Sequence, residues 1–133
     1  MNQKKRTLIF AGSIVIGSIN KFLLSFDNSN LFSQFMNCYF NDVVGCCGYC
    51  AYCDIATVLF INKELKPLYI VVIAICSGVF WEYITPLFRH DTVSDPFDIV
   101  AYSFGALMYV ILRFVVTKKS KIVEDISGER IGN

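Results

Sequence analysis

The sequence predicts an all-α protein that forms a four-helix transmembrane bundle. Of the 133 residues, 55% are hydrophobic and only 17% are charged, which is more apolar than an average soluble domain. The apolar residues gather in four blocks, each close to the ~20 residues that cross a bilayer as a helix. Because only short polar segments separate most of these blocks, neighbouring helices should run antiparallel.

The first two helices are expected over residues 7–26 and 43–62. A short basic segment precedes the first block, as in a signal peptide, but no A-x-A-like cleavage site follows it. We therefore interpret it as a membrane-spanning helix. The aromatic segment 27–42 lies between the two helices and contains no Lys or Arg. Such a composition favours a helix that lies along the membrane interface.

The third and fourth helices are expected over residues 68–88 and 96–117, followed by a tail from 118 to 133. Pro86 should kink or end the third helix, because proline removes a backbone donor. The tail is charged and short, and we expect it to be mobile with one frayed helical turn. Residues 1–117 thus form a single transmembrane domain.

Two acidic residues mark the start of the fourth helix. Asp95, Pro96, Phe97 and Asp98 match the N-cap, N1, N2 and N3 positions of a helix. Asp is favoured at the N-cap, Pro at N1, and an acid at N3 completes a capping-box pattern. Capping therefore explains both carboxylates, although Asp98 also shares a predicted face with Tyr102.

The distribution of basic residues predicts the orientation in the membrane. Lys and Arg concentrate at the helix ends expected on one side, which should be cytoplasmic. Both termini are then cytoplasmic, and the segment between the third and fourth helices faces outward. The basic residues assigned to the inner side are Lys4, Lys5, Arg6, Lys63, Lys66, Arg113, Lys118, Lys119, Lys121 and Arg130.

Polar residues at the outward end predict a cleft. On the third helix, Gly78, Glu82, Thr85 and Arg89 follow helical spacing and share one face, as do Asp98, Tyr102, Gly105 and Tyr109 on the fourth. Asp42, at the start of the second helix, is a third wall. The candidate cleft residues are Lys21, Asp42, Glu82, Arg89, His90, Asp95, Asp98 and Tyr102.

Lys21 and Glu82 are predicted to lie at similar depths. A rise of about 1.5 Å per residue places each about 21 Å from the inner end of its helix. Charges inside a bilayer usually pair, so one hypothesis joins Lys21 to Glu82. In the alternative, Lys21 extends outward and Glu82 is protonated or bonded to Tyr83 or Thr85. His90 is a candidate acid–base or pH-sensing residue, or simply a solvated loop residue.

Asp54 and the cysteines lie within the second helix. Asp54 is about 16 Å from Val43, near the middle of the membrane, and is a candidate functional acid. We favour a neutral Asp54 bonded to Ser77, Thr57 or a tyrosine. The run GCCGYCAYC at 45–53 lacks the second ligand pair of a zinc site. Its cysteines should therefore pack as small apolar residues, and no metal or cofactor is expected.

The segment WEYITPLFRHDTVSDPFDIVAYSFG resembles the second half of the VanZ-like family of small bacterial membrane proteins. The family pattern has a late Glu in one span, an Arg in the outer loop, an Asp-x-x-Asp element, and a polar residue and a Gly in the next span. It corresponds here to Glu82, Arg89, Asp95, Asp98, Ile99, Tyr102 and Gly105. The family usually has Asn at the position of Tyr102, and commonly has Gln where Thr85 or Pro86 stands here. The resemblance implies a multi-pass envelope protein, and one branch of the family is linked to teicoplanin resistance.

These observations favour a non-enzymatic protein of the bacterial plasma membrane that binds an envelope component in its outward cleft. The ligand would be lipid-linked or glycopeptide-like. Arg89 would meet an anionic group, while Glu82, Asp95 and Asp98 shape the cleft. The net charge of +1 gives no indication of a nucleic-acid partner.

Two other functions fit the same residues. A membrane-embedded enzyme acting on a lipid head group would use Glu82, His90 or Asp98 as an acid or base. A small proton- or cation-coupled carrier would use Asp54 and Glu82, and would have to oligomerise. The sequence leaves the ligand and the oligomeric state open.

Overall fold

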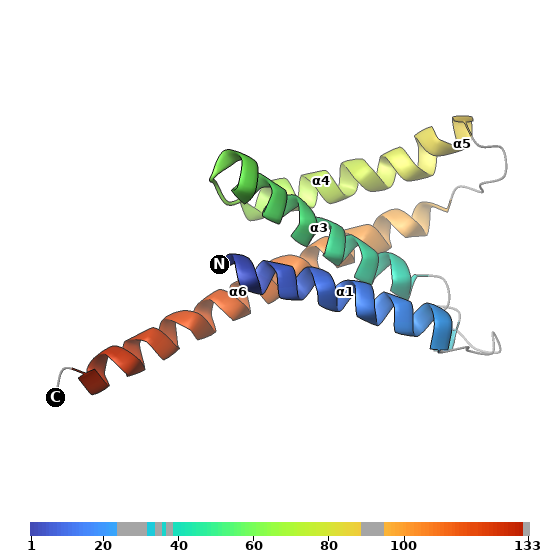
Figure 1. Ribbon diagram of the computed structural model, residues 1–133. Helices are drawn as coiled ribbons and strands as arrows, with labels where there is room; N and C mark the ends of the chain where they lie inside the picture. The colour runs from blue at the N-terminus through green and yellow to red at the C-terminus, as the bar shows by residue number, and fades with distance from the viewer. Residues whose placement is uncertain (24–31, 34–35, 37–38, 89–94, 132–133) are drawn as a thin grey trace.

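The computed structural model describes residues 1–23, 32–33, 36, 39–88 and 95–131, with side chains up to residue 119. The elements it describes are helices and contain no strand (Figure 1). In chain order they are α1 (Gln3–Leu23), α3 (Phe40–Ile61), α4 (Pro67–Val79), the π-helix η1 (Phe80–Ile84), α5 (Thr85–Phe88) and α6 (Pro96–Ile131). The predicted all-α class is confirmed.

Three stretches are long and apolar enough to cross a membrane. They are Phe40–Ile61, Pro67–Phe88 and Pro96–Lys119, which is consistent with a membrane protein. Among the described helices, α1 does not reach this standard. Its apolar run from residue 7 to residue 19, between Arg6 and Asn20, would span only about 20 Å of a hydrocarbon core of about 30 Å.

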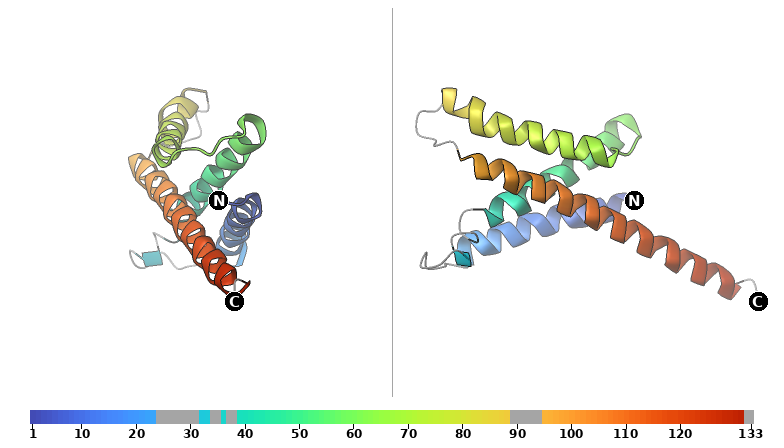
Figure 2. Two further views of the ribbon diagram at one scale, coloured as in Figure 1. Left: turned by 90° about the vertical axis from the view of Figure 1, so that its left-hand side faces the viewer. Right: turned by 180° about the vertical axis from the view of Figure 1, so that it is seen from behind.

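The last helix is longer than the sequence pattern predicts. α6 continues from Pro96 to Ile131, so most of the predicted mobile tail is helical. Figure 2 shows its C-terminal part extending beyond the other helices. The segment between Thr117 and Gly128 contains neither Gly nor Pro. Its lysines favour helix, so nothing there ends it.

Pro86 does not end the third membrane stretch. The helix continues to Phe88, and the five residues before Thr85 form the π-helix η1 instead. The Thr85 N–H donates to the Phe80 carbonyl, five residues earlier. Proline cannot donate to the carbonyl four residues before it and crowds that group. The wider turn of η1 includes Glu82, the residue four positions before Pro86, and the Glu82 side chain is buried there.

α3 contributes half of the buried core cluster and packs against both α1 and α6. The core cluster contains Cys46, Cys47, Cys50 and Ala51 from α3, Ile70 and Ala74 from α4, and Ala106 and Tyr109 from α6. The three buried cysteines therefore pack at a helix interface, as predicted.

Gly105 allows the close approach of α6 to α3. A Cβ atom at this position would lie 2.7 Å from the Cβ atom of Cys46 and would also clash with the Val43 carbonyl oxygen. Only a residue without a side chain fits there. The predicted common face of Asp98, Tyr102, Gly105 and Tyr109 is thus the face of α6 that packs on the bundle.

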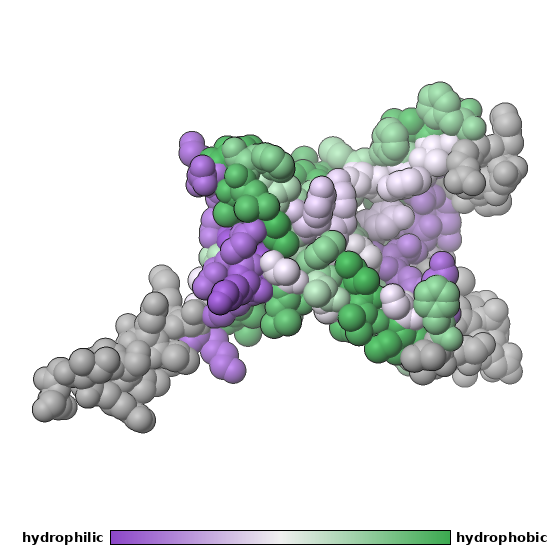
Figure 3. Space-filling model, in the orientation of Figure 1, coloured by the Kyte–Doolittle hydropathy of each residue, from purple (hydrophilic) through white to green (hydrophobic). Residues whose placement is uncertain are grey.

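Polar residues lie at both ends of the bundle. We call the end with the turn between α3 and α4 the turn end, and the opposite end the acidic end. Figure 3 shows hydrophilic residues gathered at the turn end and a second hydrophilic region toward the acidic end. These two regions contain most of the candidate site residues.

Candidate functional site

Asp95 joins three helical elements at the acidic end. Its Oδ1 accepts the Phe97 N–H at 3.0 Å, its Oδ2 accepts the Tyr39 hydroxyl at 3.0 Å, and its own N–H donates to Oε2 of Glu82 at 2.7 Å. The first bond is an N-cap, so the predicted capping role of Asp95 is confirmed. The other two bonds tie the start of α6 to the start of α3 and to η1.

Glu82 occupies the place that a capping box gives to Asp98. In a capping box the N3 carboxylate accepts the N–H of the N-cap residue. Here the N–H of Asp95 goes to Glu82, from another helix. The carboxylate of Asp98 instead interacts with those of Asp42, Glu82 and Asp95. We call these four residues the acidic group.

The acidic group combines four carboxylates from α3, η1 and the start of α6. Glu82 is 7% exposed, while Asp42, Asp95 and Asp98 are partly buried. Within the described residues, no Lys or Arg forms an ion pair with any of them. Negative charge is therefore concentrated here, and a ligand group that donates hydrogen bonds would reduce the repulsion.

The predicted pairing of Lys21 with Glu82 is wrong. Lys21 is exposed, and no ion pair joins these two described residues. Its neighbour Asn20 faces inward, 5% exposed, and donates to Oδ1 of Asn41 on α3 at 3.2 Å. The predicted equal depth of Lys21 and Glu82 does not determine which side of α1 faces the bundle.

The two alternative partners proposed for Glu82 are also not used. Thr85 donates its hydroxyl hydrogen to the Phe80 carbonyl at 3.4 Å, and Tyr83 is exposed. Arg89 and His90, together with the loop that joins α5 to α6, lie outside the described residues.

Asp54 is the centre of a buried charge network at the turn end. Its Oδ2 accepts Nε of Arg6 at 2.8 Å and the Tyr109 hydroxyl at 2.7 Å, and lies 3.5 Å from Nη1 of Arg113. Its Oδ1 accepts the Leu65 N–H at 3.2 Å. The predicted tyrosine partner is confirmed. The picture of a lone neutral acid is wrong, because the residue is paired with arginine.

The other predicted partners of Asp54 bond elsewhere. The Ser77 hydroxyl lies 3.3 Å from the Tyr49 hydroxyl, and the Thr57 hydroxyl donates to the Cys53 carbonyl at 2.8 Å. Asp54 itself is 0% exposed. Both oxygens of its carboxylate accept hydrogen bonds from the protein.

Glu64 extends the charge network to the surface. Both arginines of the network donate to it, Arg113 at 2.6 Å, and so does the amino group of Met1 at 2.6 Å. Burial raises the pKa of this carboxyl, but the three charged donors outweigh burial and lower the pKa to about 2. Arg113 also donates to the Leu65 carbonyl at 2.6 Å. The network thus fastens α1, α3 and α6 to one turn.

Sequence reasoning missed four members of this network. Arg6, Glu64 and Arg113 served only as markers of orientation or of a turn, and Tyr109 only as part of a face. The available signal was Arg113, a charge inside an apolar segment, since such charges usually have a partner. Asp54 was the matching acid in the neighbouring helix.

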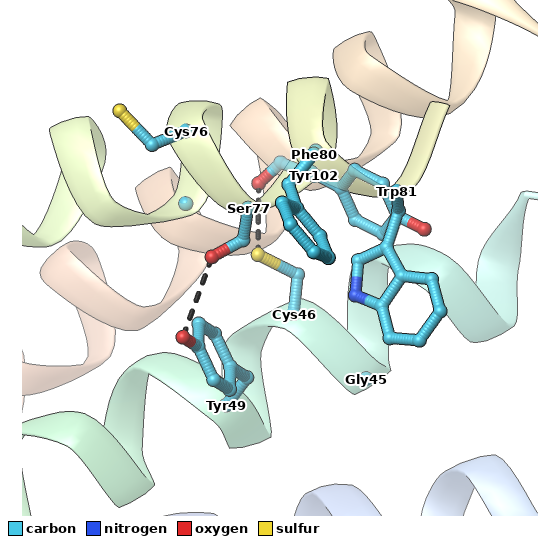
Figure 4. Close-up of a pocket in the computed structure, with 10 residues that line it drawn as sticks. Gly45, Cys46, Tyr49, Cys76, Ser77, Phe80, Trp81 and Tyr102 are labelled. Atoms are coloured by element: carbon cyan, nitrogen blue, oxygen red, sulfur yellow. Dashed lines mark hydrogen bonds between the residues drawn. The ribbon is translucent and has the colours of Figure 1, made fainter. Parts of the chain in front are cut away.

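A cavity of about 650 Å³ lies between α3, α4, η1 and α6 (Figure 4). Tyr102 lines it, and its ring lies so close to Gly78 that a Cβ atom there would be 2.7 Å from it. Tyr102 also interacts with Asp42, Asp98 and Glu82, so this cavity adjoins the acidic group. The lining residues are Gly45, Cys46, Tyr49, Ala74, Cys76, Ser77, Gly78, Phe80, Trp81 and Tyr102.

The lining of this cavity offers few free polar atoms. Tyr49 and Ser77 bond to each other, and the Cys46 thiol donates to the Tyr102 carbonyl at 3.1 Å (Figure 4). No group of three metal-binding side chains occurs among the described residues. In comparisons with known proteins, no family model, curated protein or solved structure matches this chain.

Proposed function

We propose that this chain is a multi-pass protein of the bacterial plasma membrane whose outward end binds a polar envelope component without turning it over. The observation that carries the proposal is the acidic group, in which Glu82 accepts the Asp95 N–H at 2.7 Å and Asp42, Asp98 and Tyr102 lie near enough to interact electrostatically with Glu82. Carboxylates accept hydrogen bonds from hydroxyl, amide and amine groups. A lipid-linked or glycopeptide-type ligand is rich in such donors.

The proposed topology is an antiparallel four-helix transmembrane bundle with both termini cytoplasmic. The contacts of Arg6 and Met1 with Glu64 support it, because they bring the N-terminus to the turn between α3 and α4. Lys63, Lys66 and other basic residues lie at this turn end, and basic residues favour the cytoplasmic side. The acidic end then faces outward.

α1 completes the proposed bundle through contacts with protein. Its Arg6 is buried on Asp54, and its Ser13 packs on Gly48, where a Cβ atom would be 3.0 Å away. A helix too polar to be stable in lipid alone can cross a bilayer when its polar residues face partners. This argument makes α1 the fourth span.

Arg89 is assigned the anionic part of the ligand. It follows Glu82 and precedes Asp95 in the order that resembles the VanZ-like pattern. Its guanidinium would bind a phosphate in the fork geometry typical of arginine. The acids and Arg89 would thus recognise opposite parts of one head group.

The carrier alternative loses support from the charge network. A proton- or cation-coupled carrier needs an intramembrane acid that takes up and releases its ion. Both carboxylate oxygens of Asp54 already accept protein donors, including Arg6. Its geometry suits holding helices together.

Retention of a polyprenyl diphosphate that carries an amino sugar, by the purified protein in detergent, tests the proposal, because the sugar can donate hydrogen bonds to the acidic group while the diphosphate meets Arg89. Polyprenol, which lacks the phosphates, is the comparison. We expect Arg89→Ala to weaken diphosphate retention about tenfold, as the loss of one charge-assisted contact of about 1.4 kcal/mol would do. The matched control is Arg130→Ala, which should bind like wild type. Equal retention of the diphosphate lipid and of polyprenol by all variants would contradict the proposal.

Accessibility labelling tests the orientation separately. A single Cys introduced at Asp91, in a chain whose native cysteines are replaced by Ala, should react with an impermeant maleimide in intact cells. A Cys introduced at Lys66 should react only after the cells are opened. The reverse pattern would place the acidic end in the cytoplasm and remove the basis of the proposed function.

A further inference from the structure

The cavity between α3, α4, η1 and α6 has no role in head-group binding as proposed above. It adjoins the acidic group through Tyr102 but extends away from it, along α4 and η1 from Ala74 to Trp81. Seven residues of helix correspond to about 10 Å. The cavity is therefore a deep apolar extension of the polar site.

The size of the cavity excludes an ordinary packing defect. Voids in protein interiors rarely exceed the size of a water molecule. An apolar cavity of about 150 Å³ already holds a benzene ring, and this cavity is about four times larger at 650 Å³. It falls within the range of cavities that bind small molecules.

Water is a poor occupant of this cavity. A buried water needs two to four polar partners. The hydroxyls of Tyr49 and Ser77 bond to each other, and the Cys46 thiol is bonded to the Tyr102 carbonyl. Most other lining residues, such as Ala74, are apolar.

The rim of the cavity opens onto the surface that would face lipid. Trp81, Phe80 and Tyr49 are all exposed while also lining the cavity. Figure 4 shows Trp81 at one end and the Tyr49–Ser77 pair at the other. Both α3 and the stretch Pro67–Phe88, which contains α4 and η1, are long and apolar enough to span a membrane, so the space between them opens to hydrocarbon.

We propose that this cavity binds one hydrocarbon chain of an amphipathic lipid, whose head group lies at the acidic group. The chain enters sideways between α3 and α4 and lies between Gly45 on α3 and the Ala74 and Gly78 wall of α4, beside the Trp81 ring. This inference deepens the proposed function by naming the ligand as a lipid with a hydrocarbon chain. The position of the head group rests on the proposed function. The binding of the chain does not rest on it, because it requires only the cavity.

Trp81 is the only tryptophan of the chain, so its fluorescence reports on the cavity. Bromine atoms quench tryptophan on contact. The probe is methyl dibromostearate, which has a chain but neither phosphate nor sugar, titrated into the detergent-solubilised protein. Methyl stearate, which has no bromine, serves as the reference that does not quench. We expect quenching that saturates at one probe per protein, above the linear quenching caused by probe in the micelle.

Two variants fill the cavity from opposite walls. A Cβ atom at Gly45 meets nothing within 4 Å, so Gly45→Leu adds bulk without a backbone clash. Ser77→Leu fills the cavity from α4. Each should weaken the saturable quenching at least tenfold. Gly12→Leu is the matched control, because a Cβ atom at Gly12 also meets nothing within 4 Å and Gly12 does not line the cavity. This variant should behave as wild type.

Circular dichroism tests whether each variant is folded. Because there are two cavity variants, the experiment can still be read if one of them does not fold. Quenching that is linear and equal in all proteins would overturn the chain site, and so would saturable quenching that both leucine variants retain. Neither result depends on Arg89 or on a head group. A failure here would therefore leave the diphosphate experiment intact, and the reverse also holds.

Discussion

Replacing Asp54 by Asn tests whether the charge network holds the helices together. Asp54 is 0% exposed and Arg6 is 2% exposed, so their contact at 2.8 Å is shielded from water. Removal of one member of a buried ion pair costs about 3–5 kcal/mol, because the remaining charge stays buried and unpaired. Asn keeps the shape of Asp but has a single accepting oxygen, so it can accept from only one of the two positions that Tyr109 and Leu65 occupy.

The expected magnitude lies at the lower end of that range. Glu64 continues to bind both Arg6 and Arg113 after the substitution. It therefore compensates part of the positive charge of Arg6 that has lost Asp54. We therefore expect Asp54→Asn to lower the free energy of unfolding by about 3 kcal/mol. Glu64→Gln is the matched control. The Glu64 side chain is 47% exposed, so its loss should cost about 1 kcal/mol or less.

Reversible unfolding in mixed micelles, with SDS as the denaturant and circular dichroism as the signal, measures these values. A double-mutant cycle with Arg6→Met separates the pair from its surroundings. The coupling free energy between Asp54 and Arg6 should exceed about 1.5 kcal/mol, since both are buried. A cost below about 0.5 kcal/mol for Asp54→Asn, or additive effects in the cycle, would refute the reasoning.

Three further predictions use the same unfolding measurement. Gly105→Ala should destabilise by about 1–3 kcal/mol, because its Cβ atom would overlap Cys46 and force α3 and α6 apart; a cost equal to that of Gly12→Ala would contradict this. Asp95→Ala should cost about 1–2 kcal/mol through the lost N-cap, whereas Asp98→Asn should be neutral or stabilising because it reduces repulsion among the acids; similar losses in both would show that Asp98 is also a cap. The pKa of Glu64 is lowered to about 2 from an ordinary value of 4.5, so its contribution is fully present above about pH 4.5 and is lost as the pH falls toward about 2. Glu64→Gln should remove that part of the pH dependence of the free energy of unfolding. This part amounts to about 1 kcal/mol or less.

Local features of the site could be predicted from the sequence. The N-cap at Asp95 depends on four consecutive residues, and the chemistry of that position determines its bonds whatever the rest of the fold does. The common face of Asp98, Tyr102 and Gly105 follows from helical periodicity alone. Both expectations agree with the structure.

Features that depend on helix rotation or on distant pairing could not be predicted. The predicted equal depth of Lys21 and Glu82 says nothing of helix rotation, and Asn20 is the residue that α1 turns inward. Arg6 and Asp54 are 48 positions apart, and no local pattern links them. The π-helix η1, whose wider turn holds Glu82, could not be predicted from a regular 3.6-residue period.

The two ends of the bundle differ in how their charges are compensated, and this difference argues for a division of roles. At the turn end, Asp54 and Glu64 are matched by Arg6 and Arg113 at short range, so the buried charges have nothing left to bind. At the acidic end, Glu82 has given its hydrogen bond to the backbone of Asp95, and the surrounding carboxylates have no described cation. Carboxylates placed together without a cation raise the energy of the protein alone, and a ligand that donates hydrogen bonds or brings positive charge recovers that energy on binding. We therefore propose that the acidic end, where Asp95 also ties α6 to α3 and η1, gains free energy from a ligand, whereas the charges of the turn end only hold the helices.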